Sequence, residues 1–207
     1  MKGISLSMDW EQPYWRAGTK FIAGMDEVGR GALAGPIVAA AVVFASDHLP
    51  LSGINDSKQV TARVREKLAA QIQQTALCHG IGVGSVEMIN QFGIVAAQRY
   101  AMEAALNQLT KCNLIAIDGL PFKQKLLPKW PAEYEFIVKG DAKVYSIAAA
   151  SIVAKVYRDA LMVTLAAQYP AYDWKNNVGY GTTRHRLGIK TAGICEQHRK
   201  LFCRKLI

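Results

Sequence analysis

Two adjacent carboxylates, Asp26 and Glu27, follow an apolar run and stand directly before a glycine-arginine-glycine loop at 29–31. The run, 21–25, has the composition of a buried strand. Neighbouring carboxylates repel each other and resist desolvation, and a cation beside them relieves both penalties. The pair therefore predicts a metal site. Because consecutive strand residues point to opposite faces, both acids reach one cluster only if the strand ends there and the backbone turns.

Apolar segments separated by turn residues predict an α/β fold, a mixed sheet covered by helices. Strands are predicted at 20–26, 36–45, 78–86, 114–117 and 136–138, and helices at 62–75, 94–109 and 146–168. The first two strands are expected to pair antiparallel, and Ser146 to cap the last helix. We expect an N-terminal extension at 1–19, a catalytic core at 20–168 and a basic, helical, substrate-binding segment at 169–207.

Acids stand at the ends of three predicted strands: Asp26 with Glu27, then Asp118, then Asp141. Neighbouring strands lie about 4.8 Å apart, so acids at their ends can share cations. Oxygen ligands favour Mg²⁺ or Mn²⁺, and two such ions about 3.5–4 Å apart can catalyse phosphodiester hydrolysis. Asp118 and Asp141 each adjoin a glycine, so an ordinary turn is the alternative explanation for either one alone.

The formal net charge of +9 is concentrated near the C-terminus, where 174–207 holds eight Lys and Arg against one acid, Glu196. This segment predicts a polyanionic partner, most simply nucleic acid, although a solvated surface explains it equally well. No apolar stretch is long enough to span a bilayer and no signal peptide is recognisable, so we expect a cytoplasmic protein. We expect a monomer because the sequence shows no obvious pairing segment. Cys195, His198 and Cys203 match no common zinc spacing, which favours ordinary thiols.

Several polar residues are candidates for substrate contact. Arg30, between Gly29 and Gly31, could neutralise a carboxylate or touch a phosphate, and the glycine amides could donate to sugar or phosphate oxygens. Lys58, after a turn, is a candidate phosphate contact. Tyr180, in a glycine-flanked loop, could stack on a sugar or a base.

Three auxiliary candidates lie at four-residue spacing on the last predicted helix: Ser151, Lys155 and Asp159. A surface ion pair between Lys155 and Asp159 is the simpler interpretation. Alternatively, an acid on this helix could tune or extend a metal site.

Taken in order, these stretches resemble one family, the type 2 ribonucleases H and specifically the bacterial ribonucleases HII. The resemblance runs from about residue 21 to residue 202. Its motifs are GMDEVGRG at 24–31, LAGP at 33–36, DSK at 56–58, IDG at 117–119, KGDAK at 139–143, SIAAASIVAKVYRD at 146–159 and NVGYGT at 177–182.

The resemblance implies a ribonuclease H-like fold with a five-stranded sheet. It also implies an endonuclease that cuts RNA in RNA/DNA hybrids and incises 5′ of a single ribonucleotide in duplex DNA, leaving 5′-phosphate and 3′-hydroxyl ends. The backbone of Gly29-Arg30-Gly31 is expected to contact the 2′-hydroxyl, and Tyr180 to pack on the next deoxyribose. The acids expected to hold two Mg²⁺ or Mn²⁺ ions are Asp26, Glu27, Asp118 and Asp141.

The chain departs from the family pattern at three positions. Ala32 stands where proline is common, Val178 replaces a frequent lysine, and Leu201 replaces a usual serine. These changes bear on substrate affinity and remove no catalytic carboxylate. A sliding clamp is a possible recruiting partner.

Three other functions compete with this one. The glycines at 29, 31 and 35 loosely fit a dinucleotide-binding oxidoreductase, but the acids would repel a pyrophosphate and the next segment is a predicted strand rather than a helix. A non-catalytic nucleic-acid-binding protein would explain the basic tail alone. A related nuclease could act on another substrate, such as branched DNA.

Overall fold

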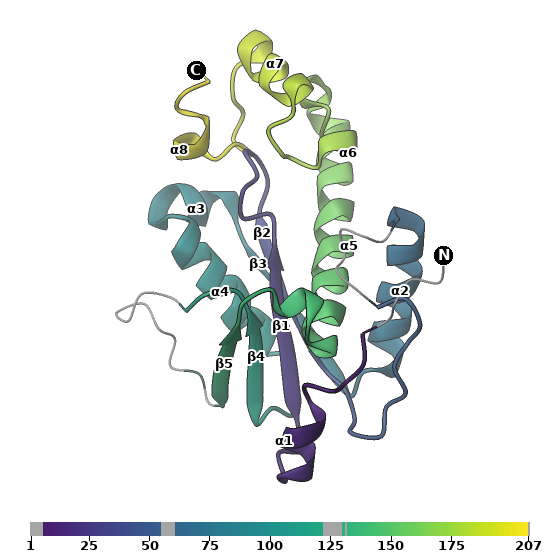
Figure 1. Ribbon diagram of the computed structural model, residues 1–207. Helices are drawn as coiled ribbons and strands as arrows, with labels where there is room; N and C mark the ends of the chain where they lie inside the picture. Colours follow the sequence, from purple (N-terminus) through teal and green to yellow (C-terminus); the bar gives the residue numbers. More distant parts are fainter. Residues whose placement is uncertain (1–5, 55–60, 122–129, 131, 207) are drawn as a thin grey trace.

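The structure is a computed structural model that describes residues 6–54, 61–121, 130 and 132–206. Its centre is a five-stranded sheet with the order β3-β2-β1-β4-β5 (Figure 1). β1 pairs antiparallel with β2 and parallel with β4, while β2–β3 is antiparallel and β4–β5 is parallel. The strands are β1 (Ile22–Val28), β2 (Ile37–Val43), β3 (Cys78–Gly84), β4 (Leu114–Asp118) and β5 (Glu133–Ile137). The predicted mixed α/β sheet is confirmed.

Helices cover both faces of this sheet. The long α5 (Tyr145–Gln168) packs on β1 and β2 with α2 (Ala62–Thr75) beside it, and α4 (Ile94–Leu106) packs on β3 and β2 from the other side (Figure 1). Every residue of β2 is buried between the two layers. On β3, side chains at Gly80, Gly82 or Gly84 would collide with α4 carbonyls, so these glycines permit close packing.

Three short helices, α6 (Trp174–Asn177), α7 (Thr183–Ala192) and α8 (Lys200–Cys203), gather beyond the end of α5 (Figure 1). They form a small apolar core with the C-terminal half of α5, and the segment before α8 pairs with the loop after β1 through an Ala34–His198 bridge. The tail is helical, as predicted. Within the described part of the chain, no helix is long and apolar enough to cross a membrane.

The N-terminal segment corrects one prediction. Ser146 does not cap α5, which begins at Tyr145 with Val144 at the N-cap position. Instead, the backbone N–H and hydroxyl of Ser146 both donate to Oε1 of Glu11, each at 2.9 Å. Glu11 precedes α1 (Gln12–Arg16) and is buried, and desolvation raises its pKa. A carboxylate from the extension thus satisfies donors in the first turn of α5.

Other predicted boundaries also shift. An additional helix, α3 (Val86–Phe92), follows β3, where Ser85 Oγ accepts the N–H of Met88 at 3.1 Å. The predicted strand to residue 86 therefore ends at Gly84. β5 begins three residues earlier than predicted. A prediction based on apolar composition missed its first residues because they are mostly polar, as suits an exposed edge strand.

Candidate active site

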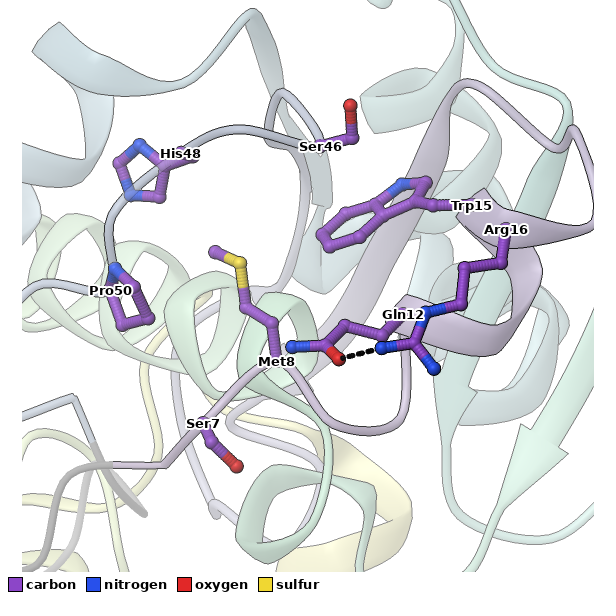
Figure 2. A pocket seen from close by; sticks show the side chains of 8 residues that line it. All are labelled: Ser7, Met8, Gln12, Trp15, Arg16, Ser46, His48 and Pro50. Atoms are coloured by element: carbon purple, nitrogen blue, oxygen red, sulfur yellow. Dashed lines mark hydrogen bonds between the residues drawn. The ribbon is translucent and has the colours of Figure 1, made fainter.

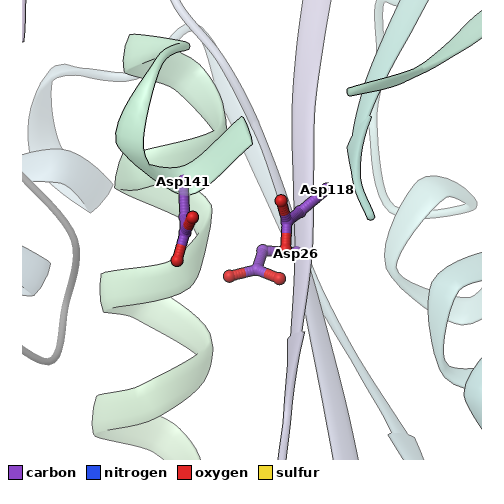
Figure 3. Close-up of side chains that lie close together, drawn as sticks. All are labelled: Asp26, Asp118 and Asp141. Atoms are coloured by element: carbon purple, nitrogen blue, oxygen red, sulfur yellow. The ribbon is translucent and has the colours of Figure 1, made fainter. Parts of the chain in front are cut away.

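Three aspartates meet near the carboxyl ends of β1 and β4 (Figure 3). Asp26 lies on β1, Asp118 is the last residue of its parallel neighbour β4, and Asp141 lies in the 3₁₀ turn Gly140–Ala142 before α5. One carboxylate oxygen from each lies within 4.8 Å of the others. The structure therefore brings three of the four predicted acids into one group that could hold a metal ion.

Burial and repulsion act against the charged form of Asp26 in this cluster. Asp26 is only 8% exposed, and desolvation, followed by Glu27 and Asp118, raises its pKa well above the ordinary value. Two backbone N–H groups donate to the cluster, that of Glu27 to Asp26 Oδ1 at 2.7 Å and that of Gly140 to Asp118 Oδ1 at 2.6 Å. Desolvation and repulsion between neighbouring carboxylates therefore favour a proton or a cation at Asp26.

Glu27 lies outside this group. β1 continues through Asp26 and Glu27 to Val28, so the turn that would bring both acids to one face is absent. Glu27 interacts with Gln98 of α4, on the opposite face from α5. Desolvation raises its pKa to about 7, while the nearby Arg30 opposes the shift. Arg30 thus partly neutralises a carboxylate, one of its two predicted roles.

A cavity of about 440 Å³ opens over the aspartates, and its wall also contains Glu27, Ser151, Lys155 and Tyr180. Glu27 and Asp118 also border a second cavity of about 600 Å³ on the α4 side. The acid that stands apart from the cluster therefore still faces the same space.

The auxiliary candidates have different surroundings. Ser151 and Lys155 line the cavity, although the Ser151 hydroxyl donates to the Ala148 carbonyl at 2.8 Å. Asp159 lies outside the aspartate group and accepts from Lys155 Nζ at 2.7 Å and from Arg65 at 3.4 Å. Lys155 and Asp159 therefore form the ion pair of the simpler interpretation. Lys58, the predicted phosphate contact, lies outside the described residues.

The Gly29-Arg30-Gly31 loop rests on two buried arginines that the sequence did not single out. Gly29 has φ +90°, and a side chain there would collide with Arg158. Arg199 Nη1 donates to the carbonyls of Gly29 at 2.7 Å and of Arg30 at 3.0 Å. In the sequence both arginines resemble surface charge, because all but one of their backbone partners lie more than 100 residues away.

Contacts with neighbouring side chains hold Tyr180 at the cavity wall. Its ring lies 5.8 Å from Lys155 Nζ and 5.5 Å from Arg158 Cζ. Its carbonyl is 3.0 Å from Nδ1 of the buried His185, whose Nε2 lies 3.0 Å from the Trp174 indole nitrogen. Since that indole can only donate, His185 Nε2 accepts and Nδ1–H donates to Tyr180.

Two other features lie apart from the carboxylates. A cavity of about 320 Å³ beside the N-terminal segment is lined by Trp15, Arg16 and His48 among others, and there Arg16 donates to Gln12 at 3.2 Å (Figure 2). It shares no lining residue with the aspartate cavity. Cys195 and Cys203 are free thiols, and neither belongs to a metal-binding group among the described residues.

Comparison with known proteins decides the family. A family model for ribonuclease HII matches residues 23–205. The ribonuclease HII of Thermosynechococcus vestitus is 46% identical over 203 residues, covering 98% of this chain and 92% of that protein. The chain belongs to the ribonuclease HII family. The ribonuclease HII of Listeria monocytogenes is also 46% identical, over 93% of this chain and 72% of that protein.

Solved structures of related proteins agree with this family assignment. Ribonuclease H2 from Pyrococcus horikoshii superposes with a TM-score of 0.74 at 26% identity, covering 90% of this chain and 96% of that one. A Bst ribonuclease HIII structure in complex with Mn²⁺, at 21% identity and TM-score 0.66 over 91% of this chain and 70% of that one, shares the fold. The protein is therefore a ribonuclease H, a hydrolase acting on RNA/DNA substrates, with a ribonuclease H-like fold. The dinucleotide alternative fails because residues 37–43 form a strand rather than a helix.

Proposed function

We propose that this member of the ribonuclease HII family is a metal-dependent endonuclease that cuts RNA in RNA/DNA hybrids. We further propose that it incises 5′ of a single ribonucleotide in duplex DNA, leaving 5′-phosphate and 3′-hydroxyl ends. The observation that carries the proposal is the group of three aspartates, with oxygens within 4.8 Å, facing a cavity that also contains Tyr180 and Lys155. An oxygen-only, partly buried set of this kind suits Mg²⁺ or Mn²⁺.

The proposed metal ligands are Asp26, Asp118 and Asp141, with Glu27 as a fourth from the adjoining side of the cavity. Two ions bound there would supply an activated water and stabilise the departing 3′ oxygen. The backbone N–H groups of Glu27 and Gly140 donate to Asp26 and Asp118 and help to orient these carboxylates. Such orientation would favour ion binding.

Substrate recognition is proposed for the surrounding residues. The backbone of Gly29-Arg30-Gly31 contacts the ribose 2′-hydroxyl, which distinguishes RNA from DNA. Tyr180 packs on the following sugar, and Lys155 faces the scissile region from α5. Lys58 and the basic 169–207 segment hold phosphates, so affinity should fall steeply with salt.

The partners and location are also proposals. We propose a cytoplasmic enzyme that works as a monomer and is recruited by a sliding clamp. A structure of a PCNA:RNase HII complex from Archaeoglobus fulgidus, 25% identical with a TM-score of 0.71 over 90% of this chain and 94% of that one, supports the clamp.

A denaturing gel with three matched duplexes tests the function: all-DNA, an RNA/DNA hybrid, and DNA with one ribonucleotide. With Mg²⁺ or Mn²⁺, we expect cleavage of the last two only, and a 3′ fragment that a DNA ligase accepts without prior phosphorylation. Asp118→Asn is the matched control, because its amide oxygen can still accept from Gly140. Unchanged cleavage by Asp118→Asn would refute the catalytic assignment, and cleavage of all-DNA would indicate a different nuclease.

A further inference from the structure

Arg199 connects the C-terminal segment to the glycine-arginine-glycine loop from inside the protein. It is fully buried, and its Nε donates to the Gly35 carbonyl at 2.9 Å. Its Nη1 donates to the carbonyls of Gly29 and Arg30. One guanidinium therefore fixes both ends of the 29–35 loop.

The direction of these bonds fixes where the loop amides point. The Gly29 carbonyl shares a peptide unit with the Arg30 N–H, and the Arg30 carbonyl shares one with the Gly31 N–H. In a trans peptide the N–H and C=O point in opposite directions. Since both carbonyls point inward to Arg199, both N–H groups point away from it. Among the residues that the structure describes, neither N–H has a hydrogen-bond acceptor.

Gly31 gives an independent reason to expect a ligand there. Its backbone is outside the left-handed region, and nothing lies within 4 Å of the position that a Cβ would take. The residue is exposed. In the described structure, then, neither conformation nor packing requires glycine at this position, whereas Gly29 is required by both. A ligand whose sugar approaches the backbone closely would require it.

The charge of Arg199 is hard to explain as a stabilising feature. Among the residues that the structure describes, no carboxylate pairs with it and its buried Nη2 has no hydrogen-bond partner, while the cation of Arg158 lies near it. Burying a cation against neutral carbonyls is costly. A cation on a carbonyl oxygen also polarises the peptide and strengthens its N–H as a donor.

We propose that Arg199 is a positioning residue that determines specificity for ribose. It turns the Arg30 and Gly31 N–H groups outward and strengthens them as donors to the 2′-hydroxyl. This inference rests on the proposed function, since it assigns the residue that prepares the proposed contact.

The test compares two dissociation constants in an Asp118→Asn background with Mg²⁺: one for a DNA duplex with a single ribonucleotide, one for the same duplex without it. We expect the parent to prefer the ribonucleotide by about tenfold or more, the value of one good hydrogen bond. Arg199→Lys lacks the planar fork and should bring the ratio close to one. Arg186→Lys is the control, because Arg186 lies in the same basic segment and donates to Gly181 rather than to the loop. Arg186→Lys should weaken binding to both duplexes by the same factor.

The outcomes separate the two proposals. No preference in the parent would refute ribose recognition and this inference with it. A clear preference that Arg199→Lys retains would refute the inference alone.

If Arg199→Lys does not fold, amide hydrogen exchange of the unsubstituted protein decides instead. We expect the Arg30 and Gly31 amides to exchange rapidly in the free protein and to be protected by the ribonucleotide duplex but not by all-DNA. Slow exchange in the free protein would overturn the inference.

Discussion

The aspartate cluster and the buried arginines behind the 29–31 loop each bring side chains of the same charge together, negative in the first and positive in the second. Their surroundings are opposite. The aspartates face an open cavity, and the hydrogen bonds described for Asp26 and Asp118 come from two backbone amides. Arg158 and Arg199 are fully buried, and together donate to carbonyls of six residues from Gly29 to Val178. Repelling carboxylates beside a cavity thus favour a bound cation, whereas guanidinium groups buried among carbonyls fix backbone geometry.

The largest effect should come from removing one charge of the cluster. Asp26→Asn should lower kcat for the hybrid by about 10³-fold or more, because a metal ligand is lost. The same change should raise the free energy of unfolding in EDTA by about 1–2 kcal/mol, because it relieves burial and repulsion. Single-turnover cleavage and urea unfolding measure the two effects. A variant that is both inactive and less stable would break the comparison, since the cluster would then be structural.

Gly29 and Gly31 separate positioning from ligand contact within one loop. Gly31→Ala should keep the free energy of unfolding within about 0.5 kcal/mol, because its Cβ meets open space, yet lower kcat/KM for a single-ribonucleotide duplex by about 10²-fold. Gly29→Ala should cost about 1–3 kcal/mol of stability through its φ of +90° and the contact with Arg158. Equal stability losses in the two variants, measured by urea unfolding, would contradict the distinction.

His198, whose Nε2 lies 3.2 Å from Nε2 of His185, should make the region around Arg199 sensitive to acid. Desolvation, and then His185, lowers the pKa of His198 to about 4, below its ordinary value of 6.5. Between these values the unfolded state binds more protons, so the free energy of unfolding falls as pH falls through this window. The loss should reach about 2 kcal/mol between pH 6.5 and pH 5.

Urea unfolding at the two pH values checks this expectation, with His198→Gln as the reference that cannot titrate. The variant should be less stable at pH 6.5 but should lose less stability on acidification. Parallel losses in both proteins would assign the acid sensitivity elsewhere.

Val178 should give the smallest effect. This β-branched residue adopts left-handed backbone, with φ 42° and ψ 38°, directly before Gly179 in the loop of Tyr180. Val178→Asn should raise the melting temperature, corresponding to about 1 kcal/mol, because asparagine tolerates this conformation. A lower melting temperature would mean that the Val178 side chain contributes more by packing than its backbone costs.

Sequence patterns predicted the strands and their convergence because both depend on local composition and on where apolar runs end. The alternation rule also identified the obstacle that leaves Glu27 on the α4 side. The patterns missed the burial of Arg199, which was counted with the basic tail, because its acceptors lie 164–170 residues away. They also missed Glu11 as the partner of Ser146, since a contact across 135 residues leaves no local signal.

The most direct test of the metal site is a crystal soaked in Mn²⁺ and measured for anomalous scattering. We expect a peak within about 2.0–2.3 Å of carboxylate oxygens from Asp26, Asp118 and Asp141, and its loss in Asp26→Asn. An ordered active site without manganese at these oxygens, or with manganese bound only elsewhere, would show that the aspartates are not the metal ligands.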